Sequence, residues 1–271
     1  MTVMSPFRRL ATGTWGDPRD PAIYASFRVR MDDALAYLEE VRRMTGKDVT
    51  VTHLVIRATA EALRRCPEAN SCVRWRRVER RQSTDVSALV LCGERGRRDL
   101  TSLTVAAADQ KSIERIADEV AEGVARIRDG TAPLERARRS LARVPRLLMR
   151  LALALSSFLT STLRLPIAGR SPFGAAVITS AGSLGIERLW GPLVWWSKAA
   201  FVLAPGKIVD EPVVEDGRVV PGKVMWIGAT FDHRIVDGIH IAEIGEALRR
   251  VLEAPFSAMR VPARAAVEVA V

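Results

Sequence analysis

The sequence has 271 residues, of which 48% are hydrophobic and 27% charged. This length and composition fit one large globular domain or two small ones, and they exclude a disordered or fibrous chain. The formal net charge of +10 comes almost wholly from arginine and no nucleic-acid-reading module accompanies it, so we expect solvated faces or acidic partners and no nucleic acid.

Hydrophobic periodicity predicts three strands and three helices in the N-terminal half. In chain order these are a strand near 25–29, a helix from Asp32 to Gly46, a helix over 52–65 that Pro67 ends, strands over 72–78 and 85–92, and an amphipathic helix over 111–128. The C-terminal half predicts strands over 175–179, 199–204 and 208–214, a tight turn at 215–218, a buried strand over 224–231 and a helix after Gly238. Strands and helices mix without regular alternation, which indicates an α+β fold.

Residues 131–172 interrupt this pattern and predict a helical, partly hydrophobic insertion. An arginine-rich stretch is followed by thirteen uncharged residues over 151–163, which is shorter than the ~20 residues that cross a bilayer. Three roles remain open for the insertion: packing on the protein or on another subunit, a lid over a substrate channel, and contact with a membrane surface.

The cysteines and the N-terminus predict the cellular setting. Cys66, Cys72 and Cys92 have no metal-ligand spacing, which favours small buried side chains in a reducing cytoplasm. Residues 1–20 contain no continuous apolar segment of the kind found in a signal peptide. We therefore expect a cytoplasmic protein with no metal site.

The most informative segment is Asp232-His233-Arg234-Ile235-Val236-Asp237-Gly238. It follows the predicted strand over 224–231 and precedes a helix with apolar residues at helical spacing. A histidine in a short loop between two rigid elements is well placed for acid–base chemistry. The other two histidines, His53 and His240, have no nearby carboxylate or cysteine pattern, and we expect structural roles for them.

The motif resembles the active-site signature of dihydrolipoamide acyltransferase catalytic domains, the core components of 2-oxo acid dehydrogenase complexes. Three further segments are similar to that family: the helix that ends in Pro67-Glu68-Ala69-Asn70, the helix entry at 107–112, and the hairpin over 211–217. The similarity extends from about residue 8 to residue 254. The resemblance implies a chloramphenicol acetyltransferase-like mixed sheet with flanking helices, as a catalytic domain over 1–254 followed by a tail over 255–271.

The resemblance also implies roles for individual residues. His233 is expected to be the general base that takes a proton from a thiol, and Asp237 to hold the loop through an arginine, for which Arg8 and Arg9 are candidates. The family's hydroxyl that faces the oxyanion falls on Thr179 or, one residue later, on Ser180. Thr230 lies where the family often has a small hydroxyl residue, so the resemblance implies that Thr230, together with Ser180, binds substrate, although a plain strand role fits Thr230 equally.

The implied reaction moves an acyl group between coenzyme A and a thiol such as dihydrolipoamide, and the implied assembly is a homotrimer with its sites between subunits, with a hollow cage as a further step. The chain departs from the family because the sequence starts at the catalytic domain, without the lipoyl and subunit-binding domains that usually precede it; we therefore expect either that a lipoyl group arrives on a separate protein or that the thiol acceptor is another molecule. It also departs at 100–105, where the family's channel segment is replaced. Two alternatives are an inactive scaffold that assembles into trimers or a cage, and a membrane-surface acyltransferase anchored by 134–165.

Overall fold

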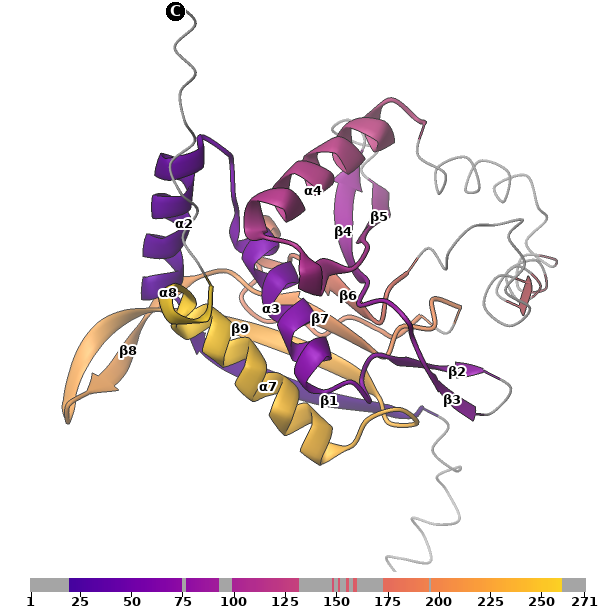
Figure 1. Ribbon diagram of the computed structural model, residues 1–271. Coiled ribbons are helices and arrows are strands. Elements are labelled where there is room, and N and C mark those ends of the chain that lie inside the picture. The colour runs from indigo at the N-terminus through magenta and orange to yellow at the C-terminus, as the bar shows by residue number, and fades with distance from the viewer. Residues whose placement is uncertain are drawn as a thin grey trace, which may run out of the picture.

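The computed structural model describes residues 20–74, 77–92, 99–131, 173–194 and 196–259, with the isolated residues 148, 151, 155, 158 and 159. They form an α+β fold in which helices cover one face of a mixed sheet (Figure 1). The predicted fold class is confirmed. The predicted insertion over 131–172 lies almost entirely outside the described residues.

In the described part of the chain, the sheet has seven strands in the order β1-β9-β7-β6-β4-β5, and β8 pairs with the outer half of β9. β6 pairs in parallel with β4 and with β7, and the remaining pairs are antiparallel. The strands are β1 (Ala22–Arg30), β4 (Val86–Cys92), β5 (Asp99–Val105), β6 (Ala176–Thr179), β7 (Phe201–Pro205), β8 (Val209–Glu215) and β9 (Arg218–Asp232). The long strand β9 joins β1, β7 and β8 and leads directly into the His233 loop.

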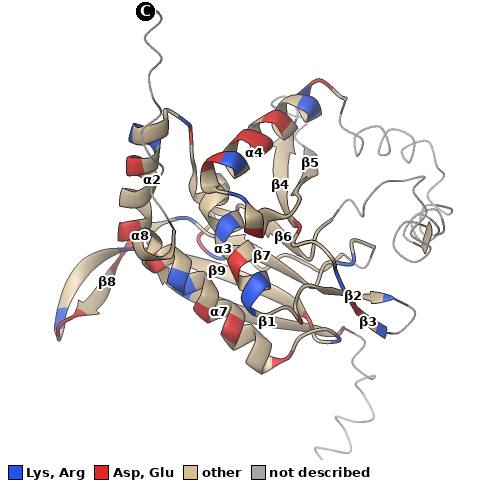
Figure 2. Ribbon diagram, viewed as in Figure 1, with Lys and Arg blue, Asp and Glu red and all other residues tan. Residues whose placement is uncertain are grey.

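The helices pack on one face of this sheet (Figure 1). They are α2 (Asp32–Thr45), α3 (Val51–Arg65), α4 (Ile113–Arg128), α7 (Gly238–Glu253) and the short α8 (Pro255–Ala258), with the 3₁₀ turns η1 (Ala108–Gln110) and η4 (Gly182–Leu184) between elements. α3 and α7 lie side by side. Lys/Arg and Asp/Glu mix along the helices, whereas β7 carries neither (Figure 2). This distribution follows from burial of the sheet and exposure of the outer helical surfaces.

Residue alternation along β9 separates two cores. Met225, Ile227, Ala229 and Phe231 have no exposed surface and belong to the large cluster under the helices. The even-numbered residues 226–232 point to the other face, because successive strand residues point to opposite sides. A smaller cluster lies there, formed by Phe173, Val177, Ala199 and Val202.

Residues 186–194 and 196–199 pass over this second face and cover part of it. At Gly206 and Gly228 a Cβ atom would collide with the carbonyl oxygens of Glu187 and Leu189, so glycine is what lets the segment lie directly on the sheet. The Trp190 indole N–H donates to Ala25 O at 2.8 Å on the far side of β9. The segment is therefore fixed at several points across the strands.

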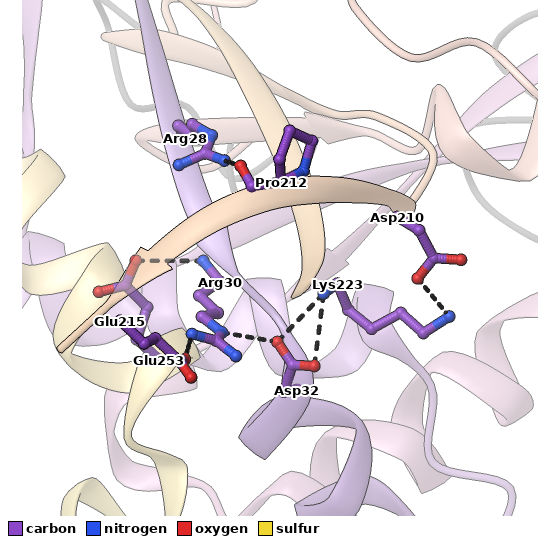
Figure 3. Close-up of polar contacts among 8 residues, drawn as sticks. All are labelled: Arg28, Arg30, Asp32, Asp210, Pro212, Glu215, Lys223 and Glu253. Atoms are coloured by element: carbon purple, nitrogen blue, oxygen red, sulfur yellow. Dashed lines mark hydrogen bonds and ion pairs between the residues drawn. The ribbon is translucent and has the colours of Figure 1, made fainter. Parts of the chain in front are cut away.

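A polar network fixes the hairpin formed by β8 and β9 to the body of the protein (Figure 3). Arg30 pairs with Glu215 and, at 2.8 Å, with Asp32. The Asp32 carboxylate also accepts the Lys223 backbone N–H at 3.1 Å. Arg28 donates to the Pro212 carbonyl, and the Lys223 ammonium pairs with Asp210 at 2.7 Å. The hairpin turn uses positive φ at Asp216 and Gly217, as its sequence predicts.

Three local predictions need correction. The strand predicted over 72–78 is wrong, because the chain turns back between β2 (Ser71–Arg74) and β3 (Arg77–Arg80), which pair in a separate two-stranded sheet. The second half of the predicted strand, now β3, is mostly exposed, so little buried surface would stabilise one long strand. β5 was not predicted as a strand, since its apolar and hydroxyl residues lack a clean alternation. The helix predicted from residue 111 begins at Ile113, after its cap Ser112.

The start of the predicted C-terminal tail is helical. Residues 255–258 form α8, and Pro255 is buried. The Phe256 ring meets the Tyr37 ring of α2 edge-on, with 5.3 Å between the ring centroids. Residues 260–271 of the predicted tail lie outside the described residues.

Candidate active site

The loop that carries His233 is held by its own backbone and by the end of β1. The backbone N–H groups of Ile235 and Val236 donate to Asp232 O, and the His233 N–H donates to Pro21 O at 2.8 Å. The Arg234 guanidinium binds the buried Asp232 carboxylate with two hydrogen bonds, of 2.8 and 2.6 Å. The motif's aspartate and arginine therefore pair with each other and make the loop rigid.

The hydrogen bonding of His233 determines which ring nitrogen is available. Its Nδ1 lies 2.9 Å from the Val236 carbonyl oxygen. Because a carbonyl only accepts, Nδ1 carries the proton and donates, and Nε2 keeps its lone pair in the neutral ring. The His233 side chain is exposed in the single chain. The loop thus presents an oriented, unprotonated imidazole nitrogen at the surface.

Asp237 begins the next helix. Its carboxylate accepts the backbone N–H groups of Ile239 and His240, and these bonds lower the pKa of Asp237. No arginine within the described ranges pairs with Asp237, and the candidates Arg8 and Arg9 lie outside them. In this chain the Asp237 carboxylate caps the helix, and the Asp237 backbone N–H, which shares a peptide with the Val236 carbonyl that orients His233, donates to His240 Nδ1.

The other two histidines have the structural roles expected of them. His53 and His240 each lie three residues after a helix cap, and each Nδ1 accepts the backbone N–H of that cap, from Thr50 and Asp237 respectively. The Nδ1 of His240 also lies 2.8 Å from the Asp237 carboxylate, within the same helix cap. Burial lowers the pKa of His53.

The predicted hydroxyl residues occupy three places. Thr179 ends β6, and Ser180 follows it, with the Thr52 hydroxyl 3.5 Å from the Ser180 hydroxyl. Thr230 is fully buried on β9, and its hydroxyl has no hydrogen-bond partner among the described residues. A buried hydroxyl without a partner is uncommon in folded proteins.

Strand register shows that Thr179 and His233 lie far apart within one chain. β6 runs parallel to β7, with Ile178 opposite Leu203, and β7 runs antiparallel to β9, with Ala204 opposite Gly228. Thr179 is therefore level with Gly228, five residues before His233, a separation of about 17 Å along the strand. Asp237 lies four residues after His233 at the start of α7, whereas Thr179 and Ser180 lie at the end of β6, about 17 Å from His233 along the strand direction.

A cavity of about 440 Å³ lies beside the His233 loop. Its lining comes from the residues on either side of His233, from the start of β1, from β2 and from the end of the segment over the second face. Lys198 is among these lining residues, and sequence analysis did not single it out. An isolated lysine in a loop carries no sequence signal that would place it beside His233.

The described residues contain neither a membrane-spanning helix nor a cluster of metal ligands. No described helix has both the length and the apolar character needed to cross a membrane. Within the described ranges, no cluster of three or more His, Cys, Asp or Glu side chains is arranged to hold a metal ion.

Solved structures with similar folds show which fold this chain has. A probable dihydrolipoamide acetyltransferase of Listeria monocytogenes matches 93% of this chain and 94% of its own, with a TM-score of 0.66 and 20% identity. The cubic core of a pyruvate dehydrogenase multienzyme complex matches 95% of this chain and 99% of its own, with a TM-score of 0.65 and 15% identity. Chloramphenicol acetyltransferase matches 86% of this chain and 89% of its own, with a TM-score of 0.50 and 15% identity. The chain has the predicted chloramphenicol acetyltransferase-like fold.

A further solved structure concerns catalytic residues. It is a dihydrolipoamide acetyltransferase of Azotobacter vinelandii, investigated for the roles of a serine, a histidine and an asparagine in its mechanism. It matches 88% of this chain and 84% of its own, with a TM-score of 0.64 and 17% identity.

Sequence comparison identifies the family. Residues 18–141 and 174–260 match the family described as 2-oxoacid dehydrogenases acyltransferase (catalytic domain). The chain belongs to this family, as predicted. The break in the match, between residues 141 and 174, falls largely within the predicted insertion.

Two relatives illustrate how far the similarity extends. The lipoamide acyltransferase component of the branched-chain α-keto acid dehydrogenase complex of Pseudomonas putida is 40% identical over 29% of this chain and 18% of its own length. The dihydrolipoyllysine-residue acetyltransferase of the pyruvate dehydrogenase complex of Zymomonas mobilis is 24% identical over 87% of this chain and 45% of its own. The chain spans less than half the length of these relatives.

Proposed function

We propose that this chain transfers an acyl group between coenzyme A and a thiol such as dihydrolipoamide, with His233 as general base. The observation that carries the proposal is the hydrogen bond from His233 Nδ1 to the Val236 carbonyl, which leaves Nε2 free to accept a proton. The histidine and asparagine named for the Azotobacter enzyme are four positions apart, as His233 and Asp237 are.

The reaction follows from the available groups. Nε2 of His233 takes the proton of the attacking thiol, and the sulfur forms a bond to the thioester carbonyl carbon. The negative charge moves to the carbonyl oxygen, where a hydroxyl donor lowers the barrier. The intermediate then collapses, the bond to the departing sulfur breaks, and the imidazolium returns its proton to that sulfur. The histidine is regenerated at each turnover.

The distance between Thr179 and His233 supports a site shared between subunits. We propose that Thr179, or Ser180 beside it, donates to the oxyanion formed next to His233 of a neighbouring copy in a homotrimer. Exposed apolar side chains support self-association: Val214 and Val219 pair near the hairpin tip and are 73% and 72% exposed. A larger cage would be a further stage of the same assembly, for which the likeness to a cubic core is the support.

The proposal also covers Thr230, the acceptor thiol and the cellular compartment. Thr230 and Ser180 would contact the substrate, and the buried Thr230 hydroxyl, which has no partner among the described residues, is the support for Thr230. The acceptor thiol would be a lipoyl group supplied by a separate lipoyl-bearing protein. A reducing cytoplasm would suit the buried free thiols Cys66 and Cys72, because burial raises the pKa of Cys66 to about 11 and keeps it protonated.

Thioester exchange between acetyl-CoA and free dihydrolipoamide tests the proposal. The wild-type protein should form acetyl-dihydrolipoamide, and His233→Gln should lower the rate of this exchange by about 10²–10⁴. His53→Gln is the matched control, because glutamine at that helix position can still accept the Thr50 N–H. Assembly without His233-dependent exchange, for any short acyl-CoA, would reject the enzyme and favour the scaffold.

A further inference from the structure

The cavity beside His233 has a specific charge arrangement. Four charged residues line it: Asp20, Lys198, Asp232 and Arg234. Its apolar lining includes Val73, Leu193 and Ile235. A volume of about 440 Å³ lies in the range of small-molecule sites, and a few polar groups in an apolar lining usually set what such a site accepts.

Three of the four charged groups are already bound. Asp232 and Arg234 neutralise each other through two hydrogen bonds. One oxygen of Asp20 accepts the Ala22 N–H at 3.1 Å, and the other lies 3.4 Å from the Tyr24 hydroxyl. Of the charged lining residues, Lys198 alone has no ion-pair or hydrogen-bond partner for its side chain in the described part of the chain. The four charges of the lining sum to zero, and the Lys198 ammonium is the one charged group among them that no described residue binds.

The backbone around Lys198 is held in place by other residues. Lys198 has φ of +56°, a left-handed conformation that a non-glycine residue adopts when its surroundings enforce it. The Arg81 guanidinium donates to the Lys198 carbonyl at 2.7 Å and to the Phe173 carbonyl at 3.3 Å. The Ser197 hydroxyl accepts the Ala199 N–H and donates to Val194 O. The turn that presents Lys198 is thus built by contacts on both sides.

We propose that Lys198 binds an anionic group of the acyl thioester substrate in the cavity beside His233. This inference rests on the proposed acyl transfer and specifies its substrate. The anion is a carboxylate on the acyl group or a phosphate of coenzyme A, both of which a lysine ammonium binds by the same charge-assisted hydrogen bonds. The apolar lining holds the methylene groups that separate this anion from the thioester.

Four substrates separate the two sources of the anion. Acetyl and succinyl thioesters are each prepared on coenzyme A and on N-acetylcysteamine, which has no phosphate. Lys198→Met keeps the length of the side chain and the same backbone preference, and Lys47→Met makes the same change at a partly exposed site beyond the end of α2, where Lys47 pairs with Asp118. Loss of a hydrogen bond to a charged group predicts a decrease in kcat/KM of about tenfold to a hundredfold in Lys198→Met.

Which substrates lose activity identifies the ligand. A decrease for the succinyl thioester on both carriers, with acetyl unchanged, assigns the acyl carboxylate to Lys198. A decrease for both coenzyme A thioesters, with both N-acetylcysteamine thioesters unchanged, assigns a phosphate. Lys198→Arg should restore part of the lost activity, because it keeps the charge. Equal activity of Lys198→Met and Lys47→Met on all four substrates overturns the proposal.

Equilibrium binding tests the same contact without turnover. Two thioethers of coenzyme A, one ending in a carboxylate and one in a methyl group, are titrated into the complete wild-type and variant proteins. Weaker binding of either thioether to Lys198→Met than to Lys47→Met supports the anion site even where no thioester exchange occurs, so the proposed reaction can fail separately. Identical affinities of the two variants for both thioethers overturn it.

Discussion

Replacing Arg81 with methionine should destabilise the protein and disturb the cavity together. The Arg81 side chain is partly buried, with its Nε enclosed and unpaired, and burial lowers its pKa, although it stays protonated at neutral pH. It donates to the carbonyls of Lys198 at 2.7 Å and Phe173 at 3.3 Å. No carboxylate among the described residues forms an ion pair with it, so its two carbonyl contacts are the interactions that the substitution removes.

The magnitude follows from these two bonds. The short bond from a charged donor contributes about 1.5–3 kcal/mol and the long one about 1 kcal/mol. Removing a partly buried cation that has no carboxylate partner offsets some of this loss. We therefore expect Arg81→Met to lower the free energy of unfolding by about 2 kcal/mol.

Urea unfolding followed by tryptophan fluorescence measures the change, at one protomer concentration for all variants, since assembly shifts apparent stability. Arg126→Met is the control, because Arg126 is exposed on α4 and lies 3.7 Å from its partner Glu122. The control should change stability by under about 0.5 kcal/mol. Arg81→Met should also reproduce the substrate preference of Lys198→Met. Stability equal to that of the control would refute the structural role given to Arg81.

Three other substitutions test separate features. His233→Gln should lower the rate of thioester exchange by about 10²–10⁴ and leave urea unfolding unchanged, because the side chain is exposed; a rate within a few-fold of wild type would exclude it as the base. Hydrogen bonds from Arg64 and Arg65 lower the pKa of Glu61 from 4.5 to about 2, so its stabilisation is full above pH 4.5 and is lost as pH falls towards 2. Glu61→Gln should therefore be less stable than wild type by at most about 3 kcal/mol at pH 7 and nearly equal to it at pH 2, and a constant difference across pH would contradict this. Gly228→Ala should cost about 1–3 kcal/mol in unfolding free energy, because the added methyl group collides with Leu189 O; an unaltered urea midpoint would show that the segment over the sheet moves freely.

Much of the fold follows from the sequence because each half of it carries strong periodic signals. The helices over 32–45, 51–65 and 113–128 begin and end within a few residues of the predicted limits, where Gly46 and Ser112 supply clear termini. The segments β2 and β3 were misjudged because arginine-rich, exposed strands lack the burial that fixes a single extended run. Local pattern therefore predicts elements best where one face is buried.

In the candidate site, too, local sequence predicts some features and not others. His233 and Asp237 lie within one short motif between a strand and a helix, and local sequence is enough to find them. The expectation that an arginine holds Asp237 arose from resemblance, whereas the residues in this chain make Asp237 a helix cap and pair Arg234 with Asp232. Motif spacing identifies the residues but does not determine which hydrogen bonds they form.

The Lys198 cavity depends on contacts that sequence distance hides. Arg81 and Lys198 are 117 positions apart, yet a 2.7 Å hydrogen bond joins them, and both lie outside the motif. Asp20 and Pro21 reach the same cavity from the start of β1, through the pairing of β1 with β9. Since the sheet order brings these segments together, variation at residues such as 198 could change which acyl group is accepted without altering the His233 loop. If His233 serves as the base for every substrate and residue 198 alone contacts the anion, one fold can accept different acyl groups through changes at residue 198.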